Sequence, residues 1–219
     1  MYHVIMLDTL FFVIIMNINW LYFFQYIALS GFPLLFSIFY VFWSLHIFPS
    51  SMYEYSYLNI SHLLQLLIYI DILQALFHWS SHTFLKKTFI GKSHMKHHIH
   101  RNPKPQDAFY TGFFDAIFQL IVPLMITLHI VQPCRITATL FGAIYSWWLN
   151  FIHSSPSITY SYLENFCIVT PYHHYRHHQD PQTNFSNIID INKILVHINE
   201  MFCHLCQYEH TLHLNCVKS

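Results

Sequence analysis

Long apolar stretches, separated by short polar breaks, run along most of this chain of 219 residues. A transmembrane helix needs about 20 consecutive, predominantly apolar residues. Some of the stretches reach this length and others lie at its lower limit. The pattern predicts an all-α fold, a polytopic membrane helical bundle of about four to five spans, with helices expected at residues 4–29, 34–48, 62–79, 109–132 and 136–152.

A basic, polar segment at residues 86–107 separates the third and fourth apolar stretches. Cytoplasmic loops of membrane proteins are enriched in lysine and arginine, so this segment is expected on the cytoplasmic side. The next two stretches are joined by a tight link at 132–135, which predicts a helical hairpin that returns the chain to that side. The segment holds six of the ten lysines and arginines: Lys86, Lys87, Lys92, Lys96, Arg101 and Lys104.

The composition also favours a membrane protein. Only 9% of the residues are charged and 54% are hydrophobic, whereas about 25% of a soluble domain is charged. The formal net charge is zero with histidine neutral, which gives no sign of nucleic-acid binding. The five cysteines are an odd number without the spacing of a secreted scaffold, which argues against a disulfide framework.

Histidine supplies the candidate functional residues, with 19 copies in the chain. Two HxxHH motifs, HMKHH and HYRHH, place imidazoles at i, i+3 and i+4, which share one face of a helix. An HWSSH motif adds a pair at i and i+4, and a single histidine follows the predicted hairpin. These candidate metal ligands are His78, His82, His94, His97, His98, His153, His174, His177 and His178.

Neutral imidazole is the common nitrogen ligand of iron, zinc and copper. A triplet at i, i+3 and i+4 can serve two adjacent ions, and eight or nine such residues are too many for one mononuclear site. The motifs therefore predict a centre with two metal ions. Histidines outside them, such as His3, His46 and His129, show that composition alone supplies some copies. The alternative for each motif is a set of solvated or core histidines.

Two aspartates within apolar stretches are candidates for orienting the ligands. Asp71 precedes His78 by seven residues, about two helical turns on one face. Asp115 opens the stretch after the basic segment. Ionisable residues in membrane spans are functional candidates, and a carboxylate that accepts an N–H from a ligand histidine orients its ring. The alternative for both is a carboxylate that lies at the membrane interface.

The order of the histidine motifs resembles the three-box signature of the fatty acid hydroxylase and sterol desaturase superfamily of membrane enzymes. An Asn-Pro pair after the second box is similar to the family's pattern. Asn184-Phe185-Ser186 resembles its Asn-aromatic-Gly motif after the last box, with serine in place of glycine. Asp190 falls where the family has an aspartate, and His153 resembles its isolated ligand after the hairpin. The resemblance covers about residues 62–195.

The resemblance implies two iron ions per chain, held mostly by histidine at the cytoplasmic end of the bundle. It implies hydroxylation or desaturation of a sterol or fatty acyl lipid with O2 and electrons from NAD(P)H, delivered through a donor such as cytochrome b5 and its reductase. It implies a location in the endoplasmic reticulum with the histidines facing the cytoplasm. No catalytic residue separate from the metal ligands is expected. Four residues are expected around the ligands: Asp71, Asp115, Asn184 and Asp190.

Three regions follow: N-terminal membrane helices at 1–61, a catalytic region at 62–195 and a divergent tail at 196–219. In the tail, Cys-x-x-Cys followed by His-x-x-His is the ligand pattern of a small zinc site, and an unstructured tail is the alternative. Two other functions stay open. A histidine-rich metal transporter would place ionisable residues along the middle of several spans. A catalytically inactive membrane relative would keep the histidine motifs without turning over a lipid.

Overall fold

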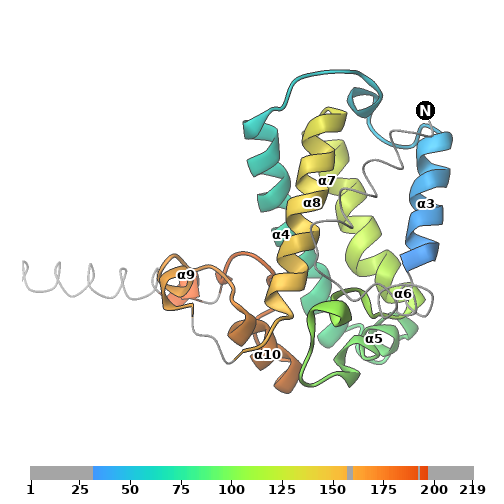
Figure 1. Cartoon of the computed structure of the whole chain (residues 1–219). Helices are drawn as coiled ribbons and strands as arrows, with labels where there is room; N and C mark the ends of the chain where they lie inside the picture. Colours follow the sequence, from blue (N-terminus) through green and yellow to red (C-terminus); the bar gives the residue numbers. More distant parts are fainter. Residues whose placement is uncertain (1–31, 157–159, 192, 197–219) are drawn as a thin grey trace, which may run out of the picture.

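The computed structural model describes residues 32–156, 160–191 and 193–196, which form a helical bundle above a cap of shorter helices (Figure 1). The long helices are α3 (Phe32–Ser44), α4 (Ile60–His82), α7 (Val122–Val131) and α8 (Arg135–Ile152). The short ones are α5 (Phe89–His94), α6 (Phe113–Asp115), α9 (Ser161–Asn165) and α10 (Pro171–Gln179).

The connections between these helices contain single helical turns. Three are 3-10 turns, η1 (Ser50–Tyr53), η2 (His97–Ile99) and η3 (Pro105–Phe109), and one is a π-helical turn, η4 (Ala116–Ile121). Within the described ranges there is no β-strand, only one isolated antiparallel bridge between Ile168 and Ile189. The all-α prediction is confirmed for this part of the chain. The predicted span at 4–29 and the cysteines and histidines of the tail lie outside the described residues.

Two helical segments are long and apolar enough to cross a membrane, Ile60–His82 and Phe113–Val131. At about 1.5 Å per residue, the 23 residues of the first cover about 35 Å, which exceeds the bilayer hydrocarbon core of about 30 Å. In the described residues α3 ends at Ser44, before the end of the span predicted at 34–48. These two segments indicate a membrane protein, and a count of four to five spans stays a prediction.

The surface of α4 explains why this helix suits lipid. Leu66 and Ile70 are fully buried against the bundle, while Leu64, Ile68 and Ile72 are about half exposed on the outside. A helix that is apolar on all sides is stable either inside a large protein or across a membrane. Because these side chains keep about half of their surface exposed, lipid is the apolar surrounding that fits this face.

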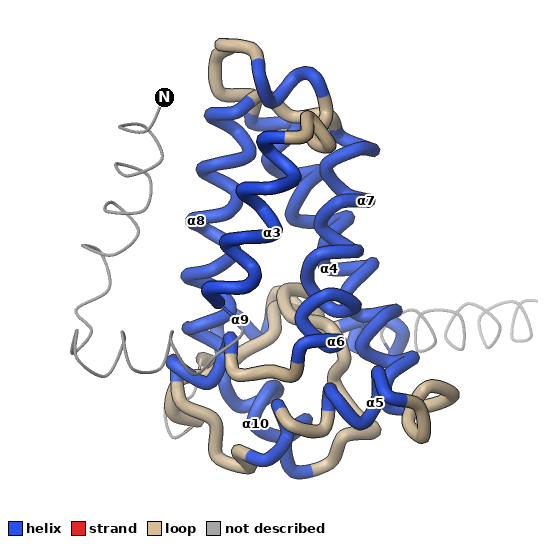
Figure 2. Tube along the Cα trace, turned by 90° about the vertical axis from the view of Figure 1, so that its right-hand side faces the viewer, coloured by secondary structure: helices blue, strands red, loops and turns tan. Residues whose placement is uncertain are grey.

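Helix α4 is the centre of the bundle and packs against both α7 and α8. Figure 2 shows the long helices running in one general direction above the short helices of the cap. The predicted hairpin is confirmed, since α7 ends at Val131 and α8 begins at Arg135. Gln132 closes α7 in the left-handed conformation with φ 50°, and its N–H donates to the carbonyl of Leu128. The hairpin therefore carries the chain back to the end of the bundle where the cap lies.

Candidate metal centre

The structure brings all the predicted ligand histidines together at the end of the bundle that carries the cap. His78 and His82 lie on the last turns of α4, and His153 lies directly after α8. The second motif lies in α5 and η2, and the third lies in α10. Each ring is buried, with 9% exposure or less: His78, His82, His94, His97, His98, His153, His174, His177 and His178.

These histidines form two adjacent groups, and within each group one nitrogen per ring lies within 4.8 Å of the others. Both groups draw on the second and third motifs, so neither motif serves one group alone. The first group contains His78, His82, His94, His98 and His177. The second contains His97, His153, His174 and His178. Two groups of this kind are the arrangement expected for a pair of metal ions.

The second motif differs from the single helix that its spacing predicts. Helix α5 ends at His94, and the 3-10 turn η2 begins at His97. The third motif is helical throughout, within Pro171–Gln179. Both motifs divide in the same way, since the i+3 histidine, His97 or His177, belongs to a different group from the i and i+4 histidines of its motif. The division therefore follows from the i, i+3, i+4 spacing itself and does not depend on the 3-10 turn.

Hydrogen bonds on the outer nitrogens show which atoms of the first group point inward. Nδ1 of His78 donates to the carbonyl of Phe185 at 2.9 Å, and Nδ1 of His177 donates to that of Thr183 at 2.5 Å. Nδ1 of His94 lies 2.9 Å from the carboxylate of Asp115. In a neutral ring whose Nδ1 carries the proton, Nε2 is an acceptor. Three lone pairs therefore face one another in a buried space, an arrangement that a cation stabilises.

In the second group too, Nδ1 atoms donate outward and leave Nε2 atoms as acceptors on the inside. Nδ1 of His97 donates to the carbonyl of Tyr110 at 3.1 Å, and Nδ1 of His153 donates to that of Leu149 at 2.7 Å. Their Nε2 atoms lie 3.4 Å apart and both are acceptors. The Nε2 atom of His174 lies 2.9 Å from that of His153. Two acceptors cannot hydrogen-bond to each other, so a metal ion between them accounts for the contact.

The spacing of the inner nitrogens fits metal coordination. Two ligand atoms at about 2.1 Å from one ion, about 90° apart, are about 3.0 Å from each other. The Nε2 atom of His94 lies 2.9 Å from that of His82 and 3.1 Å from that of His98. The Nε2 atom of His78 is buried without a hydrogen-bond partner. An unpaired buried polar atom is costly, and a metal ion satisfies it.

Burial keeps these rings neutral, which is the form that binds metal. Loss of hydration lowers the pKa of His97 to about 4, with repulsion from His94 as a smaller cause. It lowers the pKa of His153 to about 3, with His97 as a smaller cause. Burial is also the main cause that lowers the pKa of four further ligand candidates: His98, His174, His177 and His178. Each lone pair is therefore available at neutral pH.

The acidic residues predicted around the ligands have different positions. Asp115 contacts a ligand ring directly, that of His94. Asp71 contacts no ligand ring. Its buried carboxylate instead accepts the backbone N–H groups of 187, 188 and 189 at 2.8, 2.9 and 2.8 Å. It therefore anchors the loop after the third motif, because it lies on the face of α4 against which that loop packs.

Asn184 and Asp190 also lie just outside the ligand set. Asn184 adopts a positive φ of 53°, and its Nδ2 donates to the carbonyl of His173. Asp190 lies 3.4 Å from Nε2 of His173, a ring that belongs to neither group. Both residues hold the loop at 183–190 against α10. That loop presents the carbonyls that orient His78 and His177.

Sequence reasoning missed a polar cluster beside the histidines. Gln74 lies one turn before His78 on α4, Tyr145 lies on α8, and Asn187 lies in the loop after α10. Asn187 donates to Oε1 of Gln74 at 2.9 Å, and the hydroxyl of Tyr145 also donates to that oxygen. A glutamine inside an apolar stretch was the available signal, because a buried polar side chain needs partners.

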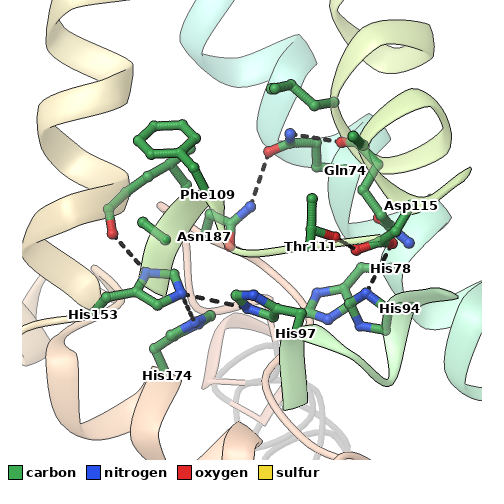
Figure 3. A pocket seen from close by; sticks show the side chains of 15 residues that line it. Gln74, His78, His94, His97, Phe109, Thr111, Asp115, His153, His174 and Asn187 are labelled. Carbon is green, nitrogen blue, oxygen red and sulfur yellow. Dashed lines mark hydrogen bonds and ion pairs between the residues drawn. The ribbon is translucent and has the colours of Figure 1, made fainter. Parts of the chain in front are cut away.

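A cavity of about 100 Å³ borders the histidines on the side that faces the long helices (Figure 3). One wall contains rings from both groups, and another contains apolar side chains such as Phe109, Leu120 and Leu149. The other polar side chains of the lining are Gln74, Thr111, Asp115, Gln119 and Asn187. An apolar wall beside clustered nitrogen ligands suits a reaction on a carbon chain, because the chain is held out of water at the metal site.

Comparison with known proteins identifies the family. Among curated proteins, the chain is similar to an alternative squalene epoxidase from Phaeodactylum tricornutum (strain CCAP 1055/1), with 29% identity over 162 residues. The match covers 73% of this chain and 46% of the relative, so the chain spans about half the relative's length. No solved structure matches. The fatty acid hydroxylase family matches residues 63–197, which include all the clustered histidines. Since the match covers more than half of the chain, the protein belongs to the fatty acid hydroxylase family.

Proposed function

We propose that this protein is a membrane-bound non-haem di-iron oxidoreductase that hydroxylates or desaturates a lipid, using O2 and electrons from NAD(P)H. The observation that carries the proposal is the pair of buried histidine groups at the end of two apolar segments. Family membership favours iron over other metals. A donor such as cytochrome b5 and its reductase would deliver the electrons, as the family resemblance implies.

The residues fit two ions. The first would be held by the group of His78 and its four neighbours, and the second by the group of His153 and its three neighbours. When bound, such a pair supplies the redox chemistry that activates O2. The chain itself orients the rings through backbone carbonyls and Asp115, keeps them neutral by burial, and limits access of water. The cavity would place one section of a lipid against the rings.

The basic segment supports an orientation with the histidines toward the cytoplasm. Its lysines and Arg101 are all exposed around the cap, where they suit the positive-inside bias. We propose the endoplasmic reticulum as the membrane, as the family resemblance implies. A transporter is less well supported, because the clustered histidines lie at the ends of the apolar segments and not along their middle.

Metal analysis of the purified full chain tests the proposal. About two iron ions per chain, together with O2 consumption that depends on added lipid and reductant, are expected. His177→Ala should abolish turnover, while His62→Ala, at a partly exposed histidine at the other end of α4, should leave it unchanged. Zinc alone, with no O2-dependent turnover after iron loading, would contradict the proposal. An iron-loaded wild type that shows no more turnover than His177→Ala would favour an inactive relative.

The curated relative suggests a second reaction on the same centre. Its name is that of a squalene epoxidase, and epoxidation also inserts one oxygen atom of O2 into a lipid. Squalene is a hydrocarbon with several double bonds, so an epoxide product from squalene would assign this reaction. A hydroxylated or desaturated product from a saturated lipid would assign the first. Incubation with both lipids and mass analysis of the products separates the two.

A further inference from the structure

The orientation of the Asn187 amide follows from a chain of hydrogen bonds that starts at a backbone carbonyl. Pro123 has no N–H, so it cannot supply the bond that an α-helix would direct to the carbonyl of Gln119. Nε2 of Gln74 donates to that carbonyl at 2.8 Å instead. A carbonyl is only an acceptor, which identifies the donor end of the Gln74 amide. Oε1 of Gln74 must then point the other way.

The same logic orients the next amide. Oε1 of Gln74 is only an acceptor, so the group 2.9 Å from it on Asn187 is Nδ2, a donor. The second hydrogen of Nδ2 is directed to the hydroxyl of Tyr145 at 3.3 Å. Both hydrogens of the Asn187 amide are thereby used within the protein. The polar atom that remains to meet a ligand is Oδ1, which accepts hydrogen bonds and cannot donate them.

The backbone of Asn187 is held as firmly as its side chain. Its N–H donates to Asp71 at 2.8 Å, and its carbonyl accepts from Nε1 of Trp148 at 2.6 Å. The residue is therefore fixed from α4 and from α8 at once. Asn187 lines the cavity, and in Figure 3 its side chain lies between Gln74 and the histidine rings. A pre-oriented acceptor therefore lies in the lining of the cavity, near apolar side chains such as Phe109 and Leu149.

We propose that Oδ1 of Asn187 binds a hydroxyl group of the lipid substrate. The substrate would then be a lipid alcohol whose donor lies near the carbon presented to the metal centre. A hydrocarbon offers no hydrogen to this oxygen, and an ether offers only a second acceptor. The proposal rests on the proposed lipid-oxidising function and adds the chemical class of the substrate. It assigns Asn187 as a specificity residue, with Gln74 and Tyr145 as its positioning residues.

Ligand binding to the metal-free full chain tests the proposal without turnover. The probes are hexadecanol, its methyl ether and hexadecane, which share one chain and differ in the donor. Binding raises the melting temperature, and the half-saturating concentration measures affinity. For the wild type, hexadecanol should bind at least about fivefold more tightly than the ether or the alkane, as one hydrogen bond to a partly buried acceptor allows. Equal binding of alcohol and ether overturns the proposal.

Substitutions test whether Asn187 causes the preference for hexadecanol over the ether and the alkane. Asn187→Leu should remove it, while Asn102→Leu, the same change at an exposed position, should keep it. A preference that survives Asn187→Leu also overturns the proposal. If Asn187→Leu does not fold, Asn187→Ser and the wild-type comparison decide the result. Iron content is measured separately. A chain that takes up two irons on loading but shows no alcohol preference refutes the substrate class alone. A chain that prefers the alcohol but takes up no iron on loading refutes the di-iron function alone.

Discussion

Nδ1 of His94 lies 2.9 Å from Oδ1 of Asp115, and both side chains are buried. The pair links the basic segment directly to the start of the second apolar span. Asp115 is itself held, because its other carboxylate oxygen accepts from the hydroxyl of Thr111 and its N–H donates to Oγ of Ser93. The position of one ligand ring therefore depends on the register between α5 and α6.

Asp115→Asn should weaken metal binding. The amide keeps an acceptor for His94 but loses the negative charge that raises the basicity of the ring, and such changes cost about 10- to 100-fold in metal affinity. Competition with a chelator for Co²⁺ measures the change. Asp180→Asn, at an exposed site, is the matched control. An affinity equal to the wild type in Asp115→Asn would show that this contact does not tune the centre.

Single substitutions should empty the two metal positions separately. His177 belongs to the first group and His174 to the second. In either His177→Ala or His174→Ala, we expect about one ion per chain in place of about two, because one group keeps its full ligand set. Elemental analysis of the purified variants measures this. Loss of both ions from each single variant would mean that the two groups act as one site.

Asp71→Asn should destabilise the fold with its metal ligands unchanged. The carboxylate accepts three backbone N–H groups. In asparagine an NH2 group replaces one of the two oxygens, and this donor cannot accept a hydrogen bond from a backbone N–H. A buried hydrogen bond to a charged group contributes about 1.5–3 kcal/mol, so a fall of several degrees in melting temperature is expected. Faster proteolysis within 183–190 should accompany it. Unchanged melting and cleavage would exclude the anchoring role.

Gly91→Ala and Gly142→Ala should differ in sign. A Cβ at Gly91 would lie 2.4 Å from the carbonyl oxygen of Leu85 and 2.7 Å from Cα of Lys86, whereas one at Gly142 meets nothing within 4 Å. Backbone cannot move aside easily, so Gly91→Ala should lower the melting temperature and shift His94. Gly142→Ala should be neutral or stabilising by up to about 1 kcal/mol, since alanine favours helix. Thermal melts compare both with the wild type, and equal melting of the two variants would contradict the clash.

The sequence by itself determined the composition of the centre. The i, i+3, i+4 spacing of the histidine motifs and their places beside apolar stretches indicated the clustered histidines and two ions before any fold was known. The tight link before Arg135 was enough to indicate the hairpin, because a short link forces neighbouring helices to be antiparallel. Asp115 was also identified, as a carboxylate inside an apolar stretch.

Only the tertiary structure decided how these residues are used. Each group combines histidines of the second motif with histidines of the third, which requires that two segments about eighty residues apart meet at one end of the bundle. Asp71 binds a loop more than a hundred residues away in sequence, so spacing along α4 assigned it to the wrong partner. The acceptor on Asn187 exists only because α4, α8 and the loop meet there. Local patterns determine which groups a segment offers, and packing determines which of them meet.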